Sequence, residues 1–121
     1  MEHVKSSEDY LEAVLMIEER QGSCRCVDIA RQLGFSKPSV TNAIQKLEAS
    51  GFVRRAEDGR ILLTDTGMEI AGSTLSKHRF FSTLFTRLGV APDIAEADAC
   101  AIEHSISDVT YKAMREYFEK A

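Results

Sequence analysis

The segment from Cys24 to Thr64 constrains the fold of this chain most strongly, because its helix and turn signals follow one another at short spacing. "CRCVDIARQLGF" predicts a short extended stretch and then a helix that ends at Gly34. "SKPSVTNAIQKLEASGF" predicts a second helix, which begins after Ser36 and ends before Gly51, with Pro38 in its permissive first turn. Two short helices joined by a glycine-containing turn predict a helix-turn-helix.

The residues after this motif predict a β-hairpin. "FVRRAEDGRILLT" contains two short β-prone runs, and the turn between them carries Asp58 and Gly59. An Asp-Gly pair between such runs is the strongest short-range hairpin signal. A helix-turn-helix followed directly by a hairpin indicates a winged helix, so we expect a mostly α fold with a small β wing.

Helical patterns also flank the winged-helix segment. Ser6 is the predicted N-cap of a first helix that ends at Gly22. A long helix is expected from Asp65 to about residue 88, followed by a helix that begins at Pro92 and a last one in "DVTYKAMREYFEKA". We therefore expect residues 1–74 to form the winged helix-turn-helix and residues 75–121 to form a helical region.

Charge is divided unevenly along the chain. The net charge is −4, which argues against indiscriminate binding to nucleic acids. From Gln21 to Leu63, however, seven Lys or Arg residues stand against four acidic residues, a balance of +3, and the remainder carries −7. The basic charge therefore coincides with the predicted helix-turn-helix and hairpin.

The sequence carries no signal for export or membrane insertion. "MEHVKSSEDY" lacks the apolar segment of a signal peptide, and no apolar run approaches the roughly 20 residues of a membrane span. Three cysteines, two of them in "CRC", are typical of a reducing compartment. We expect a cytoplasmic protein without a membrane partner, with Cys26 in the core and Cys24 incidental.

The second helix of the predicted helix-turn-helix has the chemistry to contact DNA. Such a helix enters the major groove, where Asn can pair with adenine, hydroxyls can bond bases or phosphates, and the Thr methyl can touch thymine. Nearby Lys and Arg side chains would bind phosphates or the minor groove. The predicted contacts to double-stranded DNA are Ser36, Lys37, Pro38, Ser39, Thr41, Asn42, Lys46, Arg54, Arg55 and Arg60. The alternative is that these residues only form a solvated helix face.

A second group of residues has the chemistry of metal ligands. In "ACAIEHSISD", Cys100, Glu103 and His104 have the spacing i, i+3 and i+4, which places them on one face of a helix. Asp9 and Glu12 share a face of the first helix in the same way. Carboxylates suit Mn²⁺, whereas imidazole and thiolate shift the preference toward Fe²⁺, Co²⁺ or Zn²⁺. Each residue also has a purely structural alternative, such as packing for Cys100.

The sequence as a whole resembles the DtxR/MntR family of metal-activated bacterial repressors. The resemblance rests on "SSEDYLEAVLMIEERQG", "VDIARQLGFSKPSVTNAIQKLEASGFV", "LTDTGMEIA", "KHRFFSTLFTRLGV" and "CAIEHSIS". The length of the chain matches the shorter, manganese-responsive branch, which lacks the SH3-like domain of the iron-responsive branch. The resemblance implies a homodimer that binds a pseudo-palindromic operator, with DNA binding in residues 1–74 and metal binding and dimerisation in residues 75–121.

The resemblance also implies the metal ligands. The residues that stand at the ligand positions of the manganese branch are Asp9, Glu12, His78, Cys100, Glu103 and His104. Cys100 departs from that branch, which typically has Glu there. The iron-responsive branch has Cys at that place but Met where this chain has Asp9, so the chain is a hybrid. Mn²⁺ or Fe²⁺ is the implied activator, with Co²⁺ or Zn²⁺ as further possibilities in vitro.

A second metal site of the iron-responsive branch looks eroded, because Ser82 and Glu96 stand at its places beside His78. Two other functions are alternatives to a metal-dependent repressor. One is a winged-helix regulator that senses an organic ligand or oxidation through Cys100. The other is a metal-dependent hydrolase with Glu103 as base, which the absence of a substrate-pocket signature disfavours. We expect a regulator and no enzyme.

Overall fold

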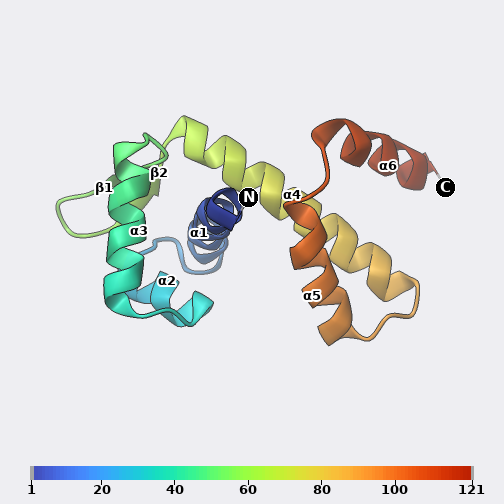
Figure 1. Cartoon of the computed structure of the whole chain (residues 1–121), viewed down its shortest axis with the longest axis horizontal. Coiled ribbons are helices and arrows are strands. Elements are labelled where there is room, and N and C mark those ends of the chain that lie inside the picture. The colour runs from blue at the N-terminus through green and yellow to red at the C-terminus, as the bar shows by residue number, and fades with distance from the viewer. Residues whose placement is uncertain (1, 121) are drawn as a thin grey trace. The chain divides into compact units, whose positions relative to one another are not determined.

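The computed structural model describes the backbone of residues 2–120 and the side chains of residues 6–120. The elements follow the order α1 (Glu2–Gln21), α2 (Cys26–Leu33), α3 (Lys37–Ala49), β1 (Val53–Arg55), β2 (Ile61–Leu63), α4 (Asp65–Arg87), α5 (Pro92–Glu103) and α6 (Asp108–Lys120) (Figure 1). This order confirms the predicted fold class of helices with a small β-hairpin. The chain divides within α4 into two compact units, Met1–Ser73 and Thr74–Ala121.

The helix-turn-helix forms where its local signals predict it. Gly34 ends α2 in the left-handed region, at φ 72°, which a residue without a Cβ adopts readily. Ser36 is the N-cap of α3, and its hydroxyl accepts a hydrogen bond from the backbone N–H of Ser39. Pro38 lies in the first turn of α3, where its missing N–H costs no helical hydrogen bond.

The wing is a two-stranded antiparallel hairpin. β1 pairs with β2 in the register Val53 with Leu63, Arg54 with Leu62, and Arg55 with Ile61. The backbone N–H of Ile61 also donates a 2.7 Å hydrogen bond to the carbonyl of Cys24, which ties the hairpin to the segment before α2.

The first unit has one core, to which α1, α2, α3, the hairpin and the start of α4 contribute. Its fully buried members include Leu11, Val14, Ile17, Cys24, Ile29, Val40, Ile44, Val53, Ile61 and Ala71. The expectation that Cys26 is core and Cys24 incidental was wrong. Cys24 is 1% exposed within this core, whereas Cys26 is half-buried and packs at its edge as the first residue of α2. Burial raises the pKa of the Cys24 thiol to about 12 and leaves it unreactive.

The first helix starts earlier than the sequence suggests. α1 begins at Glu2, so Ser6 lies inside the helix and is not its cap. The segment from residue 2 to residue 6 contains neither Pro nor Gly, so no strong breaker stops the helix from extending back past Ser6.

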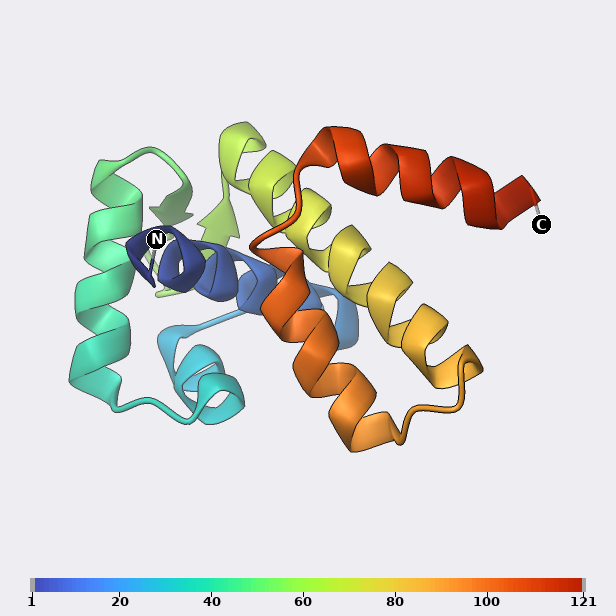
Figure 2. The ribbon, with the colours of Figure 1, turned by 45° about the vertical axis from the view of Figure 1, so that its right-hand side comes forward.

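The second unit packs the later turns of α4 against α5 and α6. Figures 1 and 2 show α5 beside this part of α4. Its core is formed by Phe81, Ala99 and Tyr111, surrounded by the partly buried Phe80, Leu84, Phe85, Ile102, Ile106 and Met114. Most of the large apolar side chains of this unit therefore pack within it. The large side chains left exposed are Leu88, Ile94, Val109, Tyr117 and Phe118.

Within residues 2–120, no helix combines the length and apolar character needed to cross a membrane.

The close approach of α4 to the hairpin segment makes a first prediction. A Cβ on Gly67 would lie 1.9 Å from the carbonyl oxygen of Phe52, whereas one on Gly72, in the same helix, would meet nothing within 4 Å. Gly67→Ala should therefore destabilise the protein by about 1–3 kcal/mol, as overpacked sites do. Gly72→Ala should be neutral or stabilising by up to ~1 kcal/mol, since Ala favours a helix. Thermal unfolding measures both, and equal melting temperatures for the two variants would contradict the close contact.

Candidate metal centre and DNA-binding surface

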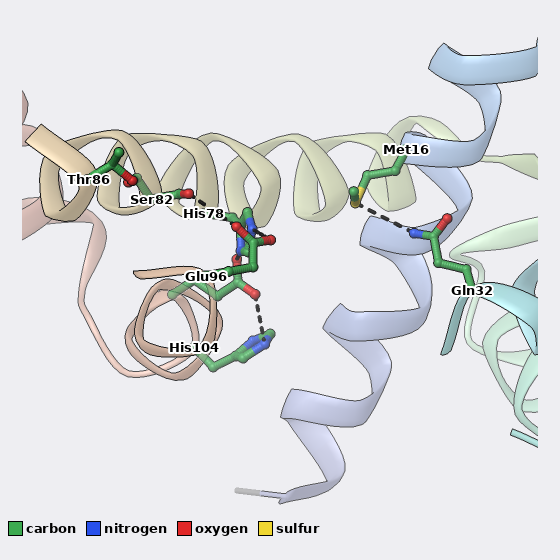
Figure 3. Close-up of polar contacts among 8 residues, drawn as sticks. Met16, Gln32, His78, Ser82, Thr86, Glu96 and His104 are labelled. Carbon is green, nitrogen blue, oxygen red and sulfur yellow. Dashed lines mark hydrogen bonds and ion pairs between the residues drawn. The ribbon is translucent and has the colours of Figure 1, made fainter. Parts of the chain in front are cut away.

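The candidate metal centre of the second unit is built around the imidazole ring of His78, which α4 places between two carboxylates of α5. The residue is 8% exposed. Its Nε2 lies 2.5 Å from Glu96 Oε1, and its Nδ1 lies 3.2 Å from Glu103 Oε2 (Figure 3). Ser82, one turn further along α4, donates a hydrogen bond to the other oxygen of Glu96. Both ring nitrogens therefore face an anion.

These carboxylates change the protonation of the ring. Glu103, with Glu96 on the other side, raises the pKa of His78 to about 9, although burial of the ring opposes this shift. In the metal-free protein at neutral pH, His78 is therefore an imidazolium that neutralises part of the negative charge around it.

Glu103 is the most deeply buried of the predicted ligands. It is 2% exposed, and its Oε1 lies 3.3 Å from Nε2 of His104. The spacing of these residues predicts a helix that includes His104, but α5 ends at Glu103 and His104 is its C-cap. Each of Cys100, Glu103 and His104 nevertheless offers a ligand atom within 4.8 Å of the others. The i, i+3, i+4 pattern thus brings these three side chains together.

The donor set of this unit fits a divalent cation. Neither carboxylate oxygen of Glu103 makes a hydrogen bond of good geometry with any residue that the structure describes, although two imidazole rings approach it. A buried carboxylate with incomplete hydrogen bonding is costly unless a cation compensates it. Thiolate, carboxylate and imidazole together are ligands for a first-row transition metal.

The remaining predicted ligands lie on α1 in the first unit. Asp9 is half-buried and Glu12 is 8% exposed. Their i, i+3 spacing within one helix places them on the same face of α1, as predicted. Glu12 is therefore buried and does not belong to a solvated helix face.

Glu96 contacts His78 directly, which sequence reasoning did not establish. Glu96, Cys100 and Glu103 follow one another on α5 at spacings of four and three residues, so they share a helix face. That spacing is the signal in the sequence that places Glu96 on the same face as the predicted ligands.

Most of the predicted DNA contacts are exposed. Ser36, Lys37, Pro38, Ser39, Asn42, Lys46, Arg54, Arg55 and Arg60 are exposed, and Thr41 is half-buried. The hydroxyls of Ser36 and Ser39 bond each other at 2.9 Å, so both also serve the cap of α3. Arg60 pairs with Asp58 at 2.8 Å. The recognition helix and the wing therefore present amide, hydroxyl and basic groups to solvent.

A winged helix in one unit and a largely buried cluster of acid, thiol and imidazole groups in the other are typical of one class of protein, the metal-responsive DNA-binding regulators. The sequence matches that class over nearly its whole length. Residues 2–60 match the family described as "Iron dependent repressor, N-terminal DNA binding domain". Residues 64–121 match "Iron dependent repressor, metal binding and dimerisation domain". The chain belongs to this family of metal-dependent transcriptional repressors.

Individual relatives agree with this assignment. The transcriptional regulator MntR of Escherichia coli O157:H7 is 31% identical over 113 residues, which are 93% of this chain and 73% of that protein. An HTH-type transcriptional regulator of Methanocaldococcus jannaschii is 32% identical, over 96% of this chain and 94% of that protein. The solved structure of the manganese regulator SloR is similar, with a TM-score of 0.80, 28% identity and 95% of this chain covered.

This chain spans only 54% of the length of the SloR chain. The relatives are transcriptional regulators and not enzymes, in agreement with the prediction from the sequence.

The charge of His78 predicts how the stability of the metal-free protein depends on pH. The folded-state pKa of about 9 lies above the ordinary value of 6.5, so the protonated ring stabilises the fold fully below pH 6.5. That contribution is lost as the pH rises through 9. With chelator present, the melting temperature should fall by about 5 °C or more across this window. His78→Gln should remove most of the fall, and parallel profiles for the variant and the native protein would contradict the charge assignment.

Proposed function

We propose that this protein is a cytoplasmic, homodimeric repressor that binds a pseudo-palindromic operator when it holds Mn²⁺ or Fe²⁺, and that it controls genes for metal uptake. The observation that carries the proposal is the buried Glu103, whose carboxylate oxygens lie against two imidazole rings without well-directed hydrogen bonds. The similarity to a manganese regulator supports the choice of metal.

The proposed ligands are the six residues that match the family's positions, namely Asp9, Glu12, His78, Cys100, Glu103 and His104. A bound divalent cation would supply positive charge to these acidic side chains. Within the second unit, His78 must release its proton before Nδ1 can act as a ligand, and Cys100 must release its thiol proton. Holding a metal is therefore favoured as the pH rises toward the pKa of His78.

The first unit provides the connection to DNA. α1 carries Asp9 and Glu12 on one face, while its buried Leu11 and Val14 share a core with Ile44 of α3. Residues in a packed core do not move independently of one another. When Asp9 and Glu12 are engaged as ligands, the orientation of α1 is restrained, and the recognition helix α3 is restrained with it.

The dimer is proposed to form through the second unit. Val109, Tyr117 and Phe118 of α6 are exposed, at 81%, 71% and 43%. Large apolar side chains left in solvent on one helix are typical of an interaction surface. A two-fold dimer would present two recognition helices to successive major grooves, and its symmetry would require a palindromic operator.

The proposed function predicts metal-dependent binding to DNA. Fluorescence anisotropy of labelled operator DNA, selected from a pool of genomic fragments, should show binding with Mn²⁺ or anaerobic Fe²⁺ and at least tenfold weaker binding with chelator. Glu103→Gln should abolish the metal response while leaving weak, salt-dependent binding in place. Operator binding that is equally tight with chelator, or that peroxide abolishes in metal-free buffer, would instead support a regulator that senses oxidation through Cys100.

The role of Cys100 is tested separately with Co²⁺. A thiolate bound to Co²⁺ gives an intense near-ultraviolet charge-transfer band, which oxygen and nitrogen ligands do not give. The native protein should show this band, and its affinity for Co²⁺ should rise with pH more steeply than that of Cys100→Ser. Cys100→Glu should lose the band and favour Mn²⁺, because a carboxylate is a harder ligand. Stoichiometric Co²⁺ binding without the band, with unchanged affinity in Cys100→Ser, would show that Cys100 only packs.

A further inference from the structure

Arg60, in the wing, forms an ion pair with Asp58 of the same chain. Nε of Arg60 donates hydrogen bonds to both carboxylate oxygens of Asp58, at 2.8 and 3.1 Å. The backbone N–H of Arg60 donates a third, at 3.1 Å, to Asp58 Oδ1. Both side chains are about half exposed, at 46% and 51%. Asp58 therefore engages Nε of Arg60, one of the guanidinium donors that a DNA phosphate could use, and it does so in solvent.

The turn holds Asp58 in this place. The backbone N–H of Gly59 donates to the carbonyl of Ala56 at 3.0 Å, and the N–H of Ala56 donates to the carbonyl of Arg60 at 2.9 Å. Gly59 has φ 91°, a conformation that L side chains rarely adopt. The Asp58 carboxylate is thus presented by a closed turn and not by a free loop.

A second arginine attaches the same turn to the helix-turn-helix. The guanidinium of Arg25, the N-cap residue of α2, donates a hydrogen bond to the backbone carbonyl of Asp58. The backbone N–H of Arg25 is itself held by Asp28 Oδ2 at 2.9 Å. The wing tip is therefore positioned relative to α2 by a contact from Arg25, which sequence reasoning did not single out.

Asp58 is ionised under ordinary conditions. The hydrogen bond from the backbone N–H of Arg60 lowers the pKa of the Asp58 carboxyl, and the side chains of Arg60 and Arg25 act in the same direction. A carboxylate and a phosphate present similar pairs of oxygens to the planar guanidinium fork. A phosphate that binds the Nε edge of Arg60 would therefore compete with Asp58 for the Nε donor.

We propose that Asp58 sets the DNA affinity of the wing by competing with the phosphate backbone for Arg60. The inference rests on the proposed function as a DNA-binding repressor and deepens it. An exposed pair of this kind is weak enough to exchange readily on contact with DNA, and breaking it should reduce affinity by only a few fold. Asp58 thereby limits binding by the wing alone and leaves tight binding dependent on the rest of the interface.

The chain offers a matched pair of variants for the test. Asp58→Asn removes the charge but keeps an Oδ1 acceptor for the backbone N–H of Arg60, so the turn is retained. Glu57→Gln removes the same charge from the neighbouring residue, which is exposed and makes no hydrogen bond or ion pair with any residue in the described part of the chain. The difference between the two variants separates competition for Arg60 from general repulsion of DNA.

The experiment measures by fluorescence anisotropy how tightly the metal-loaded protein binds one fluorescein-labelled duplex. The proteins compared are the native protein, Asp58→Asn, Glu57→Gln, Arg60→Ala and the double variant Asp58→Asn/Arg60→Ala. Melting temperatures by circular dichroism confirm folding. Asp58→Asn should tighten binding about threefold more than Glu57→Gln, a gain within the range of an exposed ion pair. That extra gain should disappear in the Arg60→Ala background.

Three results would overturn the inference while the proposed function stands: equal gains for the two single variants, weaker binding by Asp58→Asn, or an undiminished gain when Arg60 is absent. Absence of DNA binding by the native metal-loaded protein would contradict the proposed function itself, and the inference with it.

Discussion

The buried carboxylate of Glu103 places a negative charge inside the second unit, and the surrounding groups must compensate this charge. A carboxylate so far from water must be compensated by positive charge. In the metal-free protein the imidazolium of His78 provides that charge, which is why the pKa of this ring stands at about 9. A divalent cation would provide it more fully, and the proton on His78 would then have to leave. Proton and metal are therefore alternative partners for the same buried anion.

The first unit shows how such a change could reach DNA. α1 holds two of the proposed ligands on one face, while its other residues belong to the core that supports α3. The wing is joined to the same body at two points, through the hydrogen bond from Ile61 to Cys24 and through Arg25 at the turn. The surfaces proposed to contact DNA are therefore attached to a single packed framework, of which α1 is a part.

Local signals explain why much of the fold could be predicted from the sequence. Gly34 and Gly59 act through their backbone conformation, and Ser36 acts through its side-chain cap. These local effects specify the helix-turn-helix and the hairpin. The spacing of Cys100, Glu103 and His104 likewise placed three side chains together, although α5 ends at Glu103. Features that depend on tertiary packing were not predictable in this way. The burial of Cys24 instead of Cys26, and the contact of Glu96 with His78, depend on which neighbours the fold brings into place.

Thermodynamic linkage measures whether the metal centre and the DNA-binding surface are energetically coupled. Mn²⁺ affinity should be measured by competition with a fluorescent chelator, once for the free protein and once for the protein saturated with a selected operator duplex. If the two sites are coupled, the operator should tighten Mn²⁺ binding by the same factor by which Mn²⁺ tightens operator binding, expected to be tenfold or more. Equal Mn²⁺ affinities for the free and the DNA-bound protein would contradict the account.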